Sequence, residues 1–80
     1  MLSELKNGQK VVGLKQSRRA VAEGKAVRAY LAEDADPHIT DTIEALCGEH
    51  SVPVEWVAGM RELGAACGIS VGAAVAVLLA

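Results

Sequence analysis

The chain has 80 residues, of which 51% are apolar, and its only aromatic residues are Tyr30 and Trp56. A chain of this size and composition forms one small domain with a core of Val, Leu, Ile and Ala, which excludes an intrinsically disordered segment. The formal net charge of −2 hides an asymmetry, because residues 1–28 hold seven of the eight Lys and Arg, whereas residues 29–80 hold eight of the ten acids. This division indicates an anionic partner for the first part of the chain.

Neither end of the chain has the pattern of a targeting or membrane segment. Residues 1–10 lack the apolar run and small-residue cleavage pattern of a signal peptide, and the apolar residues 71–80 are about half a membrane span in length. The two cysteines, Cys47 and Cys67, are 20 residues apart and lack the paired spacing of a zinc or redox motif. We therefore expect a cytoplasmic protein that binds no membrane, metal or cofactor and in which both thiols are small buried groups.

The first half of the chain alternates between helical and strand patterns. Residues 2–8 predict a short helix, and residues 10–14 predict a short buried strand. A helical period then starts at residue 14 and ends at Gly24. One face of this helix carries Leu14, Ser17, Ala20 and Val21. In residues 26–34 the period becomes two, which predicts a strand that leads into an acidic turn. This strand alternates Val27, Ala29 and Leu31 with Arg28 and Tyr30.

The second half of the chain continues the alternation. Pro37 suits the first turn of a helix, and residues 38–50 have apolar residues on one face and acids on the other. Residues 52–58 are β-branched and alternating, which predicts a third strand. Residues 59–68 predict a further helix, and residues 72–80 predict the last strand.

This order of elements predicts an α/β fold. Strands that alternate with helices of about ten residues form a sheet with helices on both faces, here a four-stranded sheet. The chain has no repeats, linkers or low-complexity stretches, so residues 1–80 are expected to form a single domain.

Cations crowd the start of the helix that follows Gly13. The polar side chains here are Lys15, Gln16, Arg18 and Arg19. Lys15 and Arg19 are four residues apart, so their like charges are neighbours and cost roughly a few tenths of a kcal/mol, and cations in a first turn also oppose the helix dipole. An external anion explains this arrangement better than folding does. The unpaired N–H groups of a helix start suit phosphate, and a glycine allows a close backbone approach.

The same side chains can contact nucleotide bases. The Gln16 amide can donate and accept at a base edge, and Lys15 and Arg19 can donate to guanine acceptors. This combination indicates nucleic acid rather than a lone anion. The chain has no Phe, and Trp56 stands alone in a predicted strand, so the aromatic platforms on which single strands stack are missing. We therefore expect a structured RNA or a duplex feature as the partner.

Three stretches of the sequence together resemble a known family. They are GLKQSRRAVAEGKAVRAYLAEDADP, LCGEHSVPVEWV and LGAACGISVGAAVAVL, and they cover about residues 10–80 in one register. The combination of a glycine, a polar pair, a basic residue, a strand, an acidic pair, a proline and the pattern LGxAxGI is specific. The chain resembles the kink-turn RNA-binding ribosomal proteins of the archaeal and eukaryotic L-seven-Ae type, most closely their short bacterial members. This resemblance implies a three-layer α/β/α sandwich with a four-stranded mixed sheet.

The resemblance also implies an RNA-binding site. Proteins of this family grip a kink-turn, a sharply bent internal loop of RNA that contains tandem sheared G·A pairs. Their helix start enters the groove at these pairs, which gives this role here to Gly13, Lys15, Gln16 and Arg19. The loop after LGxAxG covers the extruded nucleotide, which gives this role to Ile69, Ser70 and Val71, with Asp36 near the flipped base. Further phosphate contacts are expected from Lys10, Arg18 and Lys25.

The sequence departs from the archaeal pattern within this site. Archaeal and eukaryotic members have Asn-Glu where this chain has Lys15 and Gln16. Lys15 keeps a donor and adds a charge, and Gln16 keeps an acceptor without a carboxylate, so the G·A contact stays chemically possible. Val71 is apolar and Met60 is uncharged where some relatives carry a cation, so we expect a weaker electrostatic grip.

Two other classes of function fit parts of the sequence. The residues Glu33, Asp34, Asp36 and His38 could form a small metal-dependent enzyme site, although acids at a helix start also stabilise its dipole. The acidic helix with Asp41, Glu44 and Glu49 could dock a basic protein on the ribosome, although a solvated face explains these acids too. We favour a non-catalytic, monomeric RNA-binding protein of ribosomal type. Its partner would be a kink-turn in ribosomal RNA, a riboswitch or another non-coding RNA.

Overall fold

The computed structural model describes residues 3–80, which form four helices and four strands. In chain order these are α1 (Ser3–Asn7), β1 (Lys10–Val12), α2 (Leu14–Ala22), β2 (Ala26–Ala32), α3 (Pro37–Glu49), β3 (Val54–Val57), α4 (Met60–Ala66) and β4 (Val75–Leu79). Every helix and strand that the sequence predicts is present. The strand β1 was predicted to be buried but is half-buried, because it lies at the edge of the sheet. The predicted first helix also included residue 2, which lies outside the described residues. No helix in the described part of the chain is long and apolar enough to cross a membrane.

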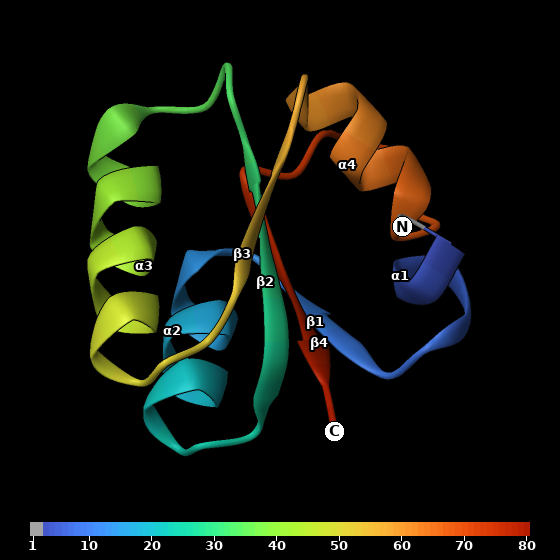
Figure 1. Ribbon diagram of the computed structural model, residues 1–80. Coiled ribbons are helices and arrows are strands. Elements are labelled where there is room, and N and C mark those ends of the chain that lie inside the picture. The colour runs from blue at the N-terminus through green and yellow to red at the C-terminus, as the bar shows by residue number, and fades with distance from the viewer. Residues whose placement is uncertain (1–2) are drawn as a thin grey trace.

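The four strands form one mixed sheet in the order β1-β4-β2-β3. Strand β4 is antiparallel to both β1 and β2, whereas β3 is parallel to β2. Helices α2 and α3 cover one face of the sheet, and α1 and α4 cover the other (Figure 1). The predicted α/β class and the three-layer α/β/α sandwich with a four-stranded mixed sheet are therefore confirmed.

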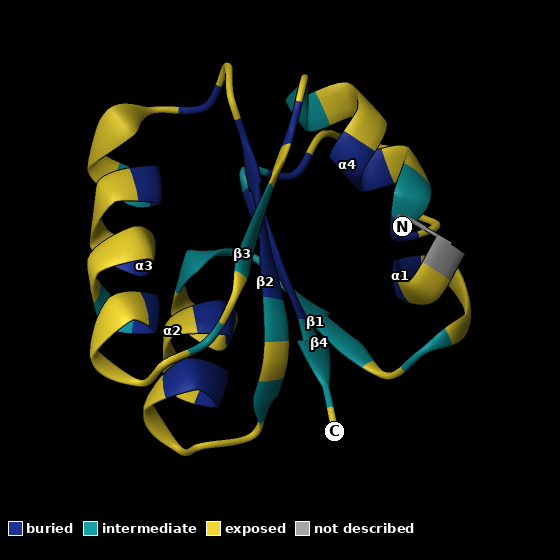
Figure 2. Ribbon diagram, in the orientation of Figure 1, coloured by how far each residue is buried: buried dark blue, intermediate teal, exposed yellow. Residues whose placement is uncertain are grey.

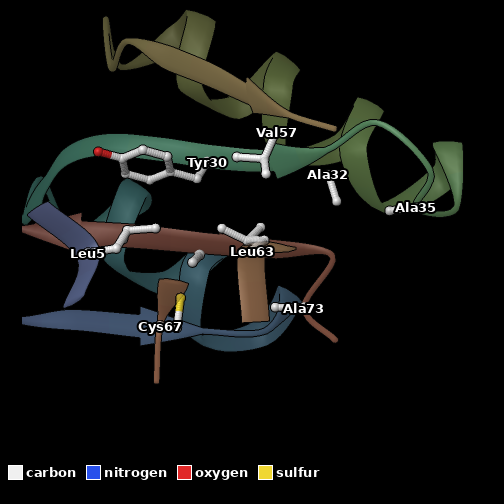
Figure 3. Close-up of a cluster of buried hydrophobic side chains, with 9 residues drawn as sticks. Leu5, Tyr30, Ala32, Ala35, Val57, Leu63, Cys67 and Ala73 are labelled. Atoms are coloured by element: carbon white, nitrogen blue, oxygen red, sulfur yellow. The ribbon is translucent and has the colours of Figure 1, made fainter. Parts of the chain in front are cut away.

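A hydrophobic core lies on each face of the sheet. Beneath α2 and α3, the side chains of Val21, Ile43 and Leu31 are fully buried. On the opposite face, Leu5 of α1 and Leu63 of α4 pack against the sheet (Figure 3). Figure 2 shows the buried residues on the inner sides of the helices and along the middle of the sheet, so the outer helix faces are free to carry charge.

The second half of β2, residues 29–32, is buried on both faces of the sheet, which its alternating sequence did not show. Tyr30 alternates with the apolar residues but is fully buried in the core on the α1 and α4 side. Val27 is instead 45% exposed, because the register between β2 and β4 shifts between Ala26 and Arg28. Burial of a strand on both faces requires helices on both sides, and the alternation of one strand cannot reveal the second layer.

Both cysteines are free and buried, as the sequence predicted. Cys47 lies in the core under α3 and Cys67 in the core under α4. Burial raises the pKa of both thiols, which keeps them in the neutral form that an apolar core tolerates.

The end of the sheet at which β2 and β3 finish is uppermost in Figure 1 and is called the upper end below. Helices α3 and α4 begin there, whereas α2 begins lower in this view, after β1 and beside the start of β4. Backbone hydrogen bonds tie these segments together. The Gly13 N–H donates to the Val75 carbonyl at 3.0 Å, and the Ala73 N–H donates to the Met60 carbonyl at 2.9 Å. The segment between α4 and β4 is therefore fixed beside the start of α2.

Candidate functional site

The start of α2 has no internal cap. Gly13 precedes the helix with φ 102° and ψ 158°, a conformation that only glycine adopts without strain. No side chain accepts a hydrogen bond from the first turn of α2, and this turn contains no acid. A helix start leaves its first backbone N–H groups without helical partners, so those of residues 14–16 can donate to an acceptor outside the protein.

The cations of α2 lie on its outer face. Ser17, Ala20 and Val21 are buried against the sheet, as the helical period predicted. The polar side chains that the sequence singled out are all exposed: Lys15, Gln16, Arg18 and Arg19. Among the described residues, Lys15 and Arg18 have no ion-pair partner within 4.0 Å. The charge at this part of the helix is therefore available to an anion.

Arg19 differs from the other two cations of α2 because it has an internal partner. Its Nε donates to Glu23 Oε2 at 2.9 Å, and Lys25 Nζ lies 3.1 Å from Glu23 Oε1. The Arg19 hydrogen bond, followed by that of Lys25, lowers the pKa of Glu23. The charge repulsion within the cluster is therefore uncompensated at Lys15 and Arg18, whereas Glu23 offsets part of the repulsion at Arg19.

The segment of residues 69–72, called the covering loop below, packs on α4. The Ile69 N–H donates to the Gly64 carbonyl at 3.1 Å. A Cβ atom on Gly64 would overlap the carbonyl oxygen of Val71 and would lie 3.1 Å from the Gly72 Cα. The glycine in α4 is therefore what allows the loop to lie so close to the helix. Ile69 and Val71 are 37% and 67% exposed, so the loop presents apolar side chains to solvent.

The covering loop borders a shallow hollow at the upper end. The hollow is lined by Asp34, Met60, Arg61, Ala65, Ile69, Ser70, Val71 and Gly72. Arg61 is the only Lys or Arg in residues 29–80, and it was not among the site residues expected from the sequence. The one feature of the sequence that could have indicated a role for Arg61 was its position as a lone cation among acids. Its place beside the covering loop depends on how α4 packs, which the local sequence does not show.

The acids around the turn after β2 hold helix starts. Asp36 caps α3, because its Oδ1 accepts from the His38 N–H at 2.9 Å. Asp34 Oδ1 accepts from the N–H of Met60, the first residue of α4, at 2.8 Å. The interpretation of these acids as helix-start residues is confirmed for both. Among the residues that the structure describes, no group of three or more His, Cys, Asp or Glu is placed to hold a metal ion.

The structure places the implied site residues in two neighbouring parts of the fold. The α3 cap and the covering loop, with Asp36, Ile69, Ser70 and Val71, lie at the upper end. Gly13, Lys15 and Gln16 lie at the start of α2, which a backbone hydrogen bond joins to the start of β4. Arg18 and Arg19 follow one turn further along α2. Lys10 starts β1 and Lys25 precedes β2, so both lie toward the opposite end of the sheet.

The start of α2 and the covering loop together suit an extended, bent polyanion. The start of α2 offers free N–H groups and exposed cations, and the covering loop offers apolar contacts. Such a surface can hold phosphates, contact base edges through Gln16, and cover a nucleotide that has left its stack.

Comparisons with known proteins identify the family of the chain. Residues 2–79 match the model of the ribosomal protein L7Ae/L30e/S12e/Gadd45 family. The chain is 48% identical over 75 residues to a protein of Geobacillus sp. (strain WCH70) named an RNA-binding protein, with 94% of this chain and 92% of that one covered. It is 45% identical over 75 residues to RNA-binding protein YbxF of Geobacillus stearothermophilus, with the same coverage. Among solved structures it is similar to the Giardia lamblia 15.5kD RNA binding protein, with a TM-score of 0.92, 30% identity, and 99% of this chain and 70% of that one covered.

Proposed function

Because the chain belongs to the ribosomal protein L7Ae/L30e/S12e/Gadd45 family, we propose that it is a non-catalytic RNA-binding protein of ribosomal type. The family match confirms the resemblance inferred from the sequence. The relatives that cover nearly the whole chain are named RNA-binding proteins, which supports RNA as the partner. We also propose that it acts as a monomer in the cytoplasm.

The RNA feature that we propose is a kink-turn with sheared G·A pairs. The observation that carries this proposal is the uncapped start of α2 with Gly13, Lys15 and Gln16, which is hydrogen-bonded to the start of β4, the strand that follows the exposed apolar covering loop. A plain duplex offers phosphates but has no extruded nucleotide for an apolar loop to cover. A sharply bent internal loop offers both at a short distance, so it uses both halves of the surface.

Each part of the site has a separate task in this proposal. The free N–H groups of the first turn of α2 hold phosphate oxygens, and Lys15 and Gln16 contact the edges of the G·A pairs. The covering loop shields the turned-out nucleotide, with Arg61 beside it as a further phosphate contact. Arg18, Lys10 and Lys25 extend the phosphate contacts away from the bend. Because the protein binds the kinked form of the RNA, it stabilises that form relative to the extended one.

The proposal concerns the RNA motif and holds for more than one kind of RNA. Ribosomal RNA, a riboswitch and other non-coding RNAs can all contain a kink-turn, and the protein surface contacts the motif rather than its surroundings.

A fluorescence experiment tests the proposed stabilisation of the kink. An RNA with a central kink-turn carries a donor and an acceptor dye on its two arms, in a buffer without divalent cations so that the RNA starts extended. Addition of the protein should raise energy transfer to the level of the bent RNA, and the Gln16→Ala variant should need a higher concentration for the same change. Binding without a rise in energy transfer would contradict the proposal.

A further inference from the structure

The carboxylate of Glu23 gains an ion pair with Arg19 at the cost of an unfavourable position for the helix dipole. It follows the last residue of α2, where an acid opposes the helix dipole. Its two oxygens are divided between Arg19 and Lys25, at 2.9 and 3.1 Å. The family resemblance assigns Arg19 to the RNA groove, and the proposed function assigns Lys25 to phosphate. One acid therefore holds two of the positive charges that would attract phosphate.

Glu23 also shares a groove with a residue proposed to contact bases. The groove runs between α2 and the neighbouring strand ends and is lined by Val11, Gln16, Arg19, Ala20, Glu23, Lys25 and Leu79. Residues 15 and 23 are eight positions apart, which is about 12 Å along the helix axis. An RNA backbone that runs along α2 would thus pass from the free cation of Lys15 to the paired cations at Glu23.

The ion pairs of Glu23 are accessible and can be exchanged. The side chains of Arg19, Lys25 and Glu23 are 77%, 67% and 39% exposed. Exposed pairs are weak, so a phosphate that approaches in a favourable position can displace the carboxylate. The same carboxylate repels a phosphate that approaches without such a position.

We propose that Glu23 is a specificity-determining residue that competes with RNA phosphates for Arg19 and Lys25 and so weakens the binding of RNA without the kink-turn. This inference rests on the proposed function. Non-specific binding comes from phosphate attraction alone, and a plain duplex can place its backbone anywhere along α2, including over Glu23. The kink-turn is held in one register by Gln16 and the covering loop. Glu23 therefore blocks alternative registers more than the specific one.

The test compares Glu23→Gln with wild-type protein on two RNAs, a kink-turn and the same RNA with its G·A pairs changed to Watson–Crick pairs. Both titrations are repeated across a range of salt concentrations. For the Watson–Crick RNA, the variant should show a steeper fall of affinity with salt, by about 0.9 in log–log slope for each additional phosphate that the protein neutralises. One additional phosphate raises affinity about fivefold at about 0.15 M salt, so the preference for the kink-turn should fall by about that factor.

The matched control is Glu44→Gln, which removes the same charge from the exposed face of α3. It should leave both the preference and the salt slope close to those of wild type. Circular dichroism of each variant checks that the fold is retained, which is expected because both side chains are at the surface.

The possible outcomes separate the two proposals. An equal rise in affinity for both RNAs, no rise, weaker binding, or the same change in Glu44→Gln would each overturn the role of Glu23. A weaker complex would mean that Glu23 holds Arg19 in place for the RNA. If wild-type protein itself shows no preference for the kink-turn, the proposed function fails, and this inference fails with it, a result visible before any variant is measured.

Discussion

Replacing Gly64 by Ala should displace the covering loop from α4. The added Cβ would overlap the Val71 carbonyl oxygen and would lie 3.0 and 3.1 Å from the carbonyl carbon of Val71 and the Cα of Gly72. All three atoms belong to the backbone, so no side-chain rotation can relieve the contact. The loop is also tied to α4 on both sides, by hydrogen bonds to the carbonyls of Gly64 and Met60.

The expected cost follows from two opposing effects. Overpacking of a well-filled site costs about 1–3 kcal/mol, and a backbone overlap belongs at the upper end of that range. Alanine in place of glycine within a helix raises the free energy of unfolding by about 1 kcal/mol. We therefore expect Gly64→Ala to lower the free energy of unfolding by about 2 kcal/mol, which corresponds to a fall in Tm of roughly 8–16 °C for a domain of this size.

Gly48→Ala in α3 is the matched control for this variant. No atom lies within 4 Å of the position that its Cβ would take, so only the increase in helix propensity applies. Urea denaturation followed by circular dichroism should show Gly64→Ala below wild type and Gly48→Ala at or slightly above it. If Gly64→Ala were as stable as Gly48→Ala, the loop would not depend on close approach to α4, and the reasoning would be refuted.

Three further predictions concern binding, capping and pH. Gln16→Ala should weaken kink-turn binding by about 1–3 kcal/mol if its amide contacts a base edge, whereas Lys25→Ala should mainly reduce the salt slope by about one unit; equal losses in titrations of both would mean that Gln16 contacts phosphate only. Asp34→Ala removes the acceptor for the Met60 N–H, so urea denaturation should show a loss of about 0.5–2 kcal/mol that Asp34→Asn largely restores. Burial, with a smaller effect of Glu4, raises the pKa of Tyr30, so the native state binds the phenol proton more tightly than the unfolded chain does. The contribution of Tyr30 to the free energy of unfolding should therefore be complete below the unfolded pKa of about 10 and should decrease as pH rises above it. Alkaline denaturation curves should show a smaller decrease for Tyr30→Phe than for wild type.

The sequence was sufficient for the order of the elements but not for their contacts. The helical period of Ser17, Ala20 and Val21 predicted the buried face of α2, because such a period depends only on residues within the helix. Burial of Tyr30 depends on α1 and α4, which come from both ends of the chain. The alternation within β2 cannot report a layer of that kind.

The same difference between local patterns and long-range contacts applies to the site. Gly13 and the cations after it were recognisable because a helix start without acids is a local pattern. The spacing of four residues between Arg19 and Glu23 allowed an ion pair, which the expectation of uncompensated cations on this helix left out. The cap that Asp34 gives to α4 joins residues 26 positions apart, and the place of Arg61 beside the covering loop also needs the folded chain. Long-range contacts of this kind leave no local signal.

The most direct test of the account is a binding titration of the purified protein against a short kink-turn RNA, beside the same RNA with its G·A pairs replaced by Watson–Crick pairs. The measurement is made at about 150 mM salt, where the Debye length is about 8 Å and non-specific attraction is screened. The account predicts a strong preference for the intact motif. Equal, weak binding to both RNAs would contradict it.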